Sequence, residues 1–208
     1  RRRTPREQSL GFMRKIVAKM NVLRSGQAAK ASLALSRAGW RSQDALNIYF
    51  FLKLSLPFAF GGAAVMVLFV AQMGSFSSPI RMAIALAAVV AGAIAPDMYI
   101  NNAAAKRKKE LTKGLPDSLD LLVICAEAGQ SLDAALTRIA GEMNAACPEI
   151  ADEIRLTALE LRLLPNRRQD LINLVNRTNV PGIRGVVNTL NQTEKYGTPL
   201  AQSLRVLA

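Results

Sequence analysis

The feature that most constrains this chain is an uncharged apolar run of membrane-spanning length. The run is "LSLPFAFGGAAVMVLFVAQM", residues 54 to 73, and it carries no charge over 20 residues. A helix needs about 20 mainly apolar residues to cross the hydrocarbon core of a bilayer. The run therefore predicts a membrane span. It begins deep in the chain and has no small-residue cleavage pattern behind it, which argues against a signal peptide.

A second apolar run follows the polar turn "GSFSSPIR". "MAIALAAVVAGAIAPDMYI", residues 82 to 100, is uncharged until Asp97, which lies near one end, where a charge can reach the interface. Together the two runs predict a hairpin of two transmembrane helices within residues 46 to 105. The alternative is a pair of buried helices in a soluble protein.

Small residues lie within both runs, Gly61 and Gly62 in the first and Gly92 in the second. Such residues let membrane helices pack closely against one another. A transport pathway would instead place polar residues deep in the spans. Lys53 and Asp97 are the charges nearest to these runs, and both lie at the ends.

The basic excess of the chain is concentrated beside the apolar runs. The formal net charge is +12, and residues 1 to 113 hold 18 Lys and Arg against four Asp and Glu, whereas residues 114 to 208 hold nine against eleven. Because basic residues flank the hairpin on both sides, the positive-inside rule places both flanks in the cytoplasm. The charge indicates topology, and no nucleic-acid partner is expected, since the second half lacks a basic excess.

Residues 1 to 45 are expected to form a basic amphipathic cytoplasmic segment. Within residues 10 to 24, apolar residues recur at helical spacing with basic residues between them. This helix could lie on the anionic inner leaflet or pack on the soluble domain. Gly39 is expected to end one helix and Ser42 to cap the next. The chain begins at Arg1 without methionine, so we expect a fragment that could have lost a span at either end.

Residues 106 to 208 show helical periodicity and no alternating strand pattern. Pro116 fits the first turn of a helix that starts there, with Asp117 and Asp120 at the positive end of its dipole. Gly129 is expected to stop that helix before the next one begins.

Five further helices are expected in the domain, the last of them only begun within this sequence. Ser131 is expected to cap the first of them, and Pro148 and Pro165 bound the next. Residues 166 to 178 and 180 to 197 supply two more, and residues 198 to 208 begin another. The predicted fold class is all-α, a transmembrane hairpin followed by a cytoplasmic antiparallel helical bundle.

The sequence contains none of the common catalytic or metal-binding motifs. The chain has no histidine, no phosphate-binding loop and no paired cysteine motif, so we expect no enzyme activity, no metal and no cofactor. Cys125 and Cys147 are interpreted as ordinary reduced residues. Glu127 and Glu194 each precede a helix-ending glycine, and Asp133 follows a cap. These carboxylates either stabilise helix ends or form a contact surface for basic residues or a divalent cation.

Three segments carry a resemblance to a known family. "LPDSLDLLVICAEAGQSLDAALTRIAGEM", "ELRLLPNRRQDLINLVNRT" and "LNQTEKYGTPLAQSLRVLA" resemble the type II secretion system F domain, in particular the TadC-like platform proteins of tight adherence pili. The resemblance covers residues 114 to 208, and the preceding hairpin fits the same arrangement. One departure is "LLPNRR", where related proteins often carry glycine. Asn166 is expected to supply the left-handed conformation of that glycine.

The resemblance implies a mechanical role in the bacterial inner membrane. It implies a multi-pass oligomer whose cytoplasmic domain contacts a hexameric secretion ATPase. The other implied partners are a TadB-like paralogous platform protein, pilin subunits and the lipid membrane. A transporter subunit, a membrane-anchored scaffold unrelated to pili and a tethered nucleic-acid binder are the competing classes. Gly129 and Gly197 are expected to set helix turns, while the acidic residues organise the bundle or its partner face. The signature positions are Asp117, Asp120, Glu127, Gly129, Asp133, Glu194 and Gly197.

Overall fold

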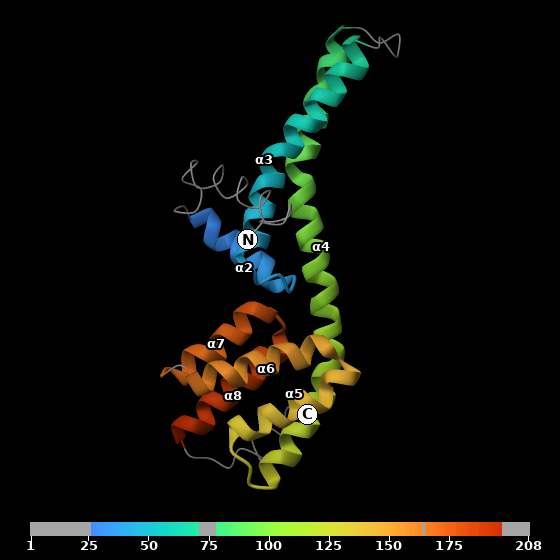
Figure 1. Cartoon of the computed structure of the whole chain (residues 1–208). Helices are drawn as coiled ribbons and strands as arrows, with labels where there is room; N and C mark the ends of the chain where they lie inside the picture. Colours follow the sequence, from blue (N-terminus) through green and yellow to red (C-terminus); the bar gives the residue numbers. More distant parts are fainter. Residues whose placement is uncertain (1–25, 71–77, 164, 197–208) are drawn as a thin grey trace, which may run out of the picture. The chain divides into compact units, whose positions relative to one another are not determined.

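The computed structural model describes residues 26–70, 78–163 and 165–196, and this part of the chain contains helices and no strands. The predicted all-α class is therefore confirmed (Figure 1). The chain divides into two compact units, residues 1–104 and 105–208. The helices predicted at residues 10 to 24 and 198 to 208 lie outside the described residues.

The first unit begins with α2 (Gly26–Arg37), followed by α3 (Gln43–Val65) with its π-helical continuation η2 (Met66–Val70), and by the start of α4 (Ser78–Glu127). Gly39 has a φ of 91°, a left-handed conformation that ends the α2 turn. The Ser42 hydroxyl accepts a hydrogen bond from the Ala45 N–H at 3.1 Å and caps α3. Both predicted helix ends are confirmed.

Two helices are long and apolar enough to cross a membrane, Gln43–Leu68 and Pro79–Glu127. Only 6% and 17% of their most apolar windows are buried within the chain. The core helices of soluble proteins bury most of such a window, so the alternative of two core helices is not favoured. The first of these helices extends eleven residues before the uncharged run at residue 54.

Two glycines let α3 and α4 approach closely. A Cβ on Gly92 would lie 2.9 Å from the Leu56 carbonyl oxygen, and one on Gly61 would lie 2.7 Å from Val89 Cγ2. A Cβ on Gly62 would meet no atom within 4 Å. The predicted close packing of small residues is confirmed at Gly61 and Gly92, whereas Gly62 faces open space.

We expect Gly92→Ala to destabilise the first unit by about 1–2 kcal/mol, because the new Cβ meets backbone that cannot rotate away. Gly62→Ala is the matched control and should leave stability unchanged or slightly higher. The single tryptophan, Trp40, stacks on Tyr99 at 5.8 Å within this unit. Its fluorescence during thermal unfolding in mild detergent measures both variants, and equal melting temperatures would contradict the prediction.

Helix α4 runs without interruption for 50 residues, so the prediction that a helix begins at Pro116 is wrong. The preceding segment "AAAKRKKEL" consists of strong helix formers, and helix propagation through it is favourable. Pro116 removes one backbone hydrogen bond. However, Leu111 and Leu119 on either side of it are both buried in the same core, and this packing keeps the helix continuous. Asp117 and Asp120 consequently lie in the helix interior, away from any positive dipole end.

Within residues 105–163 and 165–196, the second unit contains the end of α4 and four shorter helices, α5 (Leu132–Ala146), α6 (Pro148–Leu163), α7 (Arg167–Thr178) and α8 (Pro181–Tyr196). Gly129, with a φ of 74°, follows the end of α4, and Ser131 caps α5, as predicted. Asn166 has a φ of −111° and is not left-handed, so that prediction is wrong. It precedes α7 and caps it, since its side-chain oxygen accepts from the Gln169 N–H at 3.2 Å.

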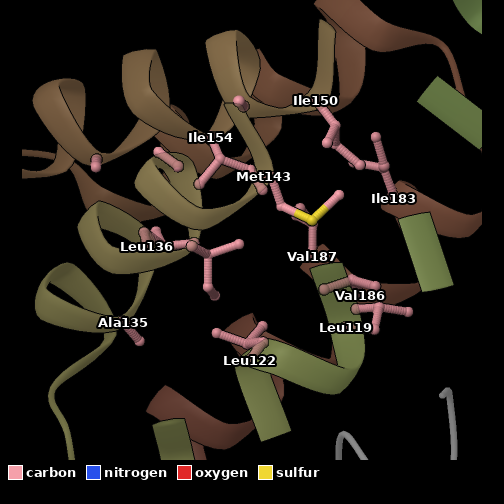
Figure 2. Close-up of a cluster of buried hydrophobic side chains, with 14 of the residues drawn as sticks. Leu119, Leu122, Ala135, Leu136, Met143, Ile150, Ile154, Ile183, Val186 and Val187 are labelled. Carbon is pink, nitrogen blue, oxygen red and sulfur yellow. The ribbon is translucent and has the colours of Figure 1, made fainter. Parts of the chain in front are cut away.

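One hydrophobic core joins all five helices of the second unit. Figure 2 shows Leu122 of α4 on the side of Leu136 of α5, Leu119 of α4 beside Val186 of α8, and Ile154 of α6 near Met143. Each buried aliphatic side chain contributes about 1.5–3 kcal/mol relative to exposure. The apolar periodicity of the sequence predicts buried faces on α4, α5 and α6. Burial is confirmed at Leu119, Leu122, Ala135, Leu136, Ile139, Ile150, Ile154, Ala158 and Leu161, whereas Val123, Ala126 and Leu132, predicted on the same faces, are only partly buried.

Candidate functional site

Three of the predicted signature residues share one exposed face of α4. Asp117, Asp120 and Glu127 are exposed, and Ile124 between them is 60% exposed. Their spacing of three, four and three residues places all four on the same side of the helix. We call these four residues the α4 face. An apolar side chain held among carboxylates on a helix surface can bind a protein partner that is itself apolar and basic.

Asp133 belongs to a different contact. It lies in the first turn of α5, and its carboxylate accepts hydrogen bonds from Arg167 at 3.1 and 3.3 Å. Both side chains are partly exposed, so the pair contributes little stability, about 0–1 kcal/mol. It fixes the start of α7 beside the start of α5. Glu194 lies in α8, but its side chain and all of Gly197 lie outside the described residues.

A buried charge network connects α4, α6 and α7 and was not predicted. Glu153 of α6 is 1% exposed and pairs with Arg107 of α4 at 2.9 Å and with Arg177 of α7 at 3.2 Å. Arg177 also donates to both oxygens of Glu160, at 2.7 and 2.8 Å, and to the Thr157 hydroxyl at 3.2 Å. The network therefore connects three helices through one carboxylate.

The network orients helices and does not offer a reaction site. A buried ion pair gains from attraction only when its geometry satisfies the groups that lose water, and both Glu153 oxygens are hydrogen-bonded. The cavity beside Glu153 has a volume of about 50 Å³ and almost entirely apolar walls. About 10–15 Å³ of such volume admits one water molecule, so this cavity has room for only a few waters.

A sequence signal for the network does exist. Glu153 and Thr157 are four residues apart on the side of α6 that carries Ile150, Ile154 and Leu161. A carboxylate on a buried helix face is almost always paired. The partners could not be named, because Arg107 lies 46 residues away in the sequence and Arg177 lies 24 away.

A second polar cluster joins α3 and α4 in the first unit. Lys53 pairs with Asp97 at 2.8 Å, and the Tyr49 hydroxyl donates to Asp97 at 2.5 Å and accepts from Lys53 at 2.9 Å. Lys53 and Asp97 are the two charges that the sequence places at the ends of the apolar runs. Their pairing neutralises both, which lowers the cost of a charge near a bilayer.

The remaining chemistry is sparse. Among the described residues, no group of three or more His, Cys, Asp or Glu is placed to hold a metal ion. Cys125 and Cys147 are free thiols, and both are buried in the core of the second unit.

Comparison with known proteins does not place the chain in a family. No family model matches it, and neither does any curated protein or solved structure. The resemblance to F-domain proteins therefore remains an interpretation of the sequence.

Proposed function

We propose that the chain is an inner-membrane platform protein of a tight adherence or type IV pilus assembly, or of a related type II secretion machine. In this role it couples a cytoplasmic secretion ATPase to pilin polymerisation. The observation that carries the proposal is the continuity of α4. One helix holds both a segment of membrane-spanning length and core residues of the second unit, such as Leu119 and Leu122.

The proposed topology follows from this helix and from the charges. Residues 46–105 form the transmembrane hairpin, and residues 106–208 form a cytoplasmic antiparallel bundle. Basic residues precede α3, and "KRKK" follows the Lys53–Asp97 pair along α4, so both flanks remain in the cytoplasm. The proposed partners are a hexameric secretion ATPase, a TadB-like paralogous platform protein and pilin subunits.

The proposed mechanism is mechanical. Conformational cycles of the ATPase move the platform, which lifts pilin subunits from the membrane into the fibre. The platform contributes no hydrolysis of its own in this scheme. The absence of a phosphate-binding loop from its sequence is consistent with this division of labour.

Gentle solubilisation of the tagged chain from its native membrane tests the proposal. Mass spectrometry of the co-purifying proteins should recover a secretion ATPase and a second F-domain protein. Reproducible recovery of a solute-binding protein or a metabolic enzyme, without the ATPase, would contradict the proposal.

Charge reversal at the signature carboxylates should weaken the machine. We expect Glu127→Arg and Glu194→Arg each to lower pilus assembly or ATPase recovery at least tenfold, because like charges across an interface cost several kcal/mol. Glu142→Arg, an equal charge change at an exposed position of α5, is the control. Variants that kept both assembly and ATPase association intact would remove the acidic residues from the proposed partner face.

A transporter subunit is the second candidate, and one observation favours it. Lys53, Asp97 and Tyr49 form a polar cluster between two helices of membrane-spanning length, and paired charges of this kind can line a solute pathway. The double variant Lys53→Met and Asp97→Asn separates the two functions. Retained ATPase recovery and pilus assembly would favour the platform, whereas lost solute uptake in the same cells would favour transport.

A further inference from the structure

A second exposed face in the same unit has the opposite charge to the α4 face. On α6, Arg155, Leu159, Arg162 and Leu163 are all exposed, with Leu159 at 51% and Leu163 at 71%. We call these four residues the α6 face. The exposed Asp152 lies one turn before Arg155 on the same side of the helix, and its carboxylate pairs with Arg107. Within the part of the chain that the structure describes, Arg162 makes no ion pair, whereas Arg155 donates to the Ala140 carbonyl and to Asn144 on the neighbouring α5.

The two faces match in spacing as well as in charge. Asp120, Ile124 and Glu127 follow one another at intervals of four and three residues, and Arg155, Leu159 and Arg162 do the same. Each face thus presents one apolar side chain between two charges. The charges are negative on α4 and positive on α6.

We propose that the α4 face of one copy binds the α6 face of a second copy, so that the second unit assembles head to tail. The apolar residue is central in both sets, so Ile124 and Leu159 can meet. A parallel arrangement would also place Asp117 opposite the exposed Asp152, so the two helices run antiparallel, which keeps these carboxylates apart. The flanking carboxylates and guanidinium groups then lie opposite one another. Exposed apolar residues gain from this burial, and the charges select the partner face.

When the α4 face of one copy binds the α6 face of another, the first copy still has a free α6 face and the second copy still has a free α4 face. Such an interface is heterologous, and it continues until the assembly closes into a ring or grows as a filament. The alternative, a two-fold contact between two α4 faces, would place Asp120 and Glu127 of one copy against the same carboxylates of the other. That repulsion excludes the symmetric pair. The inference shares Glu127 with the partner face proposed above. Asp120 and Arg162, which the charge reversals at Glu127 and Glu194 leave unchanged, therefore test self-association separately from ATPase binding.

Complementation between two variants tests the proposal with the full-length chain in detergent. Asp120→Arg damages only the α4 face, and Arg162→Glu damages only the α6 face. Each variant alone should raise the Kd for self-association at least tenfold, as measured by mass photometry across a concentration series. An equal mixture should restore dimers, because each variant keeps the face that the other lacks.

Matched controls separate charge from position. Glu142→Arg and Arg138→Glu make the same charge changes at exposed positions of α5, and both should assemble like the unchanged chain. A mixture that remains monomeric would overturn the proposal, as would an unchanged chain that is monomeric at every concentration.

Cysteine pairs give an independent result if the charge variants do not fold. The native thiols of Cys125 and Cys147 are buried, so a short thiol cross-linker should react only with introduced cysteines. Ile124→Cys and Leu159→Cys chains should cross-link when mixed, and neither should cross-link alone. Dimers of Ile124→Cys alone would overturn the proposal. Exclusive capture of a different protein by a photo-reactive residue at position 124 in native membranes would do the same.

Discussion

Replacement of Glu153 by alanine is expected to lower the free energy of unfolding of the second unit by about 3–5 kcal/mol. The reason is that Arg107 and Arg177 would remain largely buried without the carboxylate that both of them contact. Amide hydrogen exchange of α6 and α7 in the detergent-solubilised chain measures the loss locally, since these helices carry the network.

Asp152→Ala is the matched control for this prediction. Asp152 is the neighbouring carboxylate on α6, it meets Arg107 at 3.4 Å, and it is exposed. The Asp152 carboxylate is 52% exposed, and Arg107 keeps its contact with Glu153 when Asp152 is removed, so this change should cost only about 0–1 kcal/mol. If Glu153→Ala cost no more than Asp152→Ala, the two arginines would not depend on the buried carboxylate.

Gly114→Val is expected to destabilise the second unit by about 3 kcal/mol. Gly114 lies on α4, and a Cβ there would come within 2.7 Å of Cys147 Sγ and 2.9 Å of Cys147 Cβ. Cys147 is buried, so neither it nor the helix that follows it can move without disturbing the core. Urea unfolding followed by circular dichroism measures the change.

Gly141→Val provides the comparison at a helical glycine of α5. A Cβ at Gly141 would meet no atom within 4 Å. Valine is a slightly better helix former than glycine, so stability should change by no more than about 0.5 kcal/mol. Similar losses in the two variants would mean that backbone preference, and not contact with Cys147, determines the effect at position 114.

Local chemistry made most helix ends predictable. Ser42 and Ser131 cap helices through their own hydroxyl groups, and Gly39 and Gly129 adopt left-handed conformations that few other residues tolerate. These effects depend only on residues that are close in the sequence, so they can be predicted without knowledge of the tertiary structure. The same is true of the buried faces of α5 and α6, whose apolar residues recur at helical spacing.

Tertiary contacts decided the features that could not be predicted. Pro116 is a helix-starting residue by preference, yet the core contacts of Leu111 and Leu119 carry α4 through it. Asn166 and Asn179 are the same residue type before and after α7. Asn179 takes the left-handed conformation, with a φ of 51°, and Asn166 caps the helix start. Composition alone could not distinguish these roles.

The candidate site was predicted only as a set of residues. Asp117, Asp120 and Glu127 were named from their resemblance to a family, but their common face depends on α4 being continuous. Asp133 was named with them and instead pairs with Arg167. The sequence does not indicate the α6 face, because exposed arginines on a helix are usually solvated.

The burial of both cysteines has a consequence for the redox behaviour of the chain. A thiol must be accessible as thiolate before it can exchange with glutathione or with a disulfide, and Cys125 and Cys147 are 4% and 9% exposed. The folded chain should therefore be indifferent to the redox potential of its compartment. Glutathionylated or disulfide-linked species in a preparation would measure how often the second unit opens.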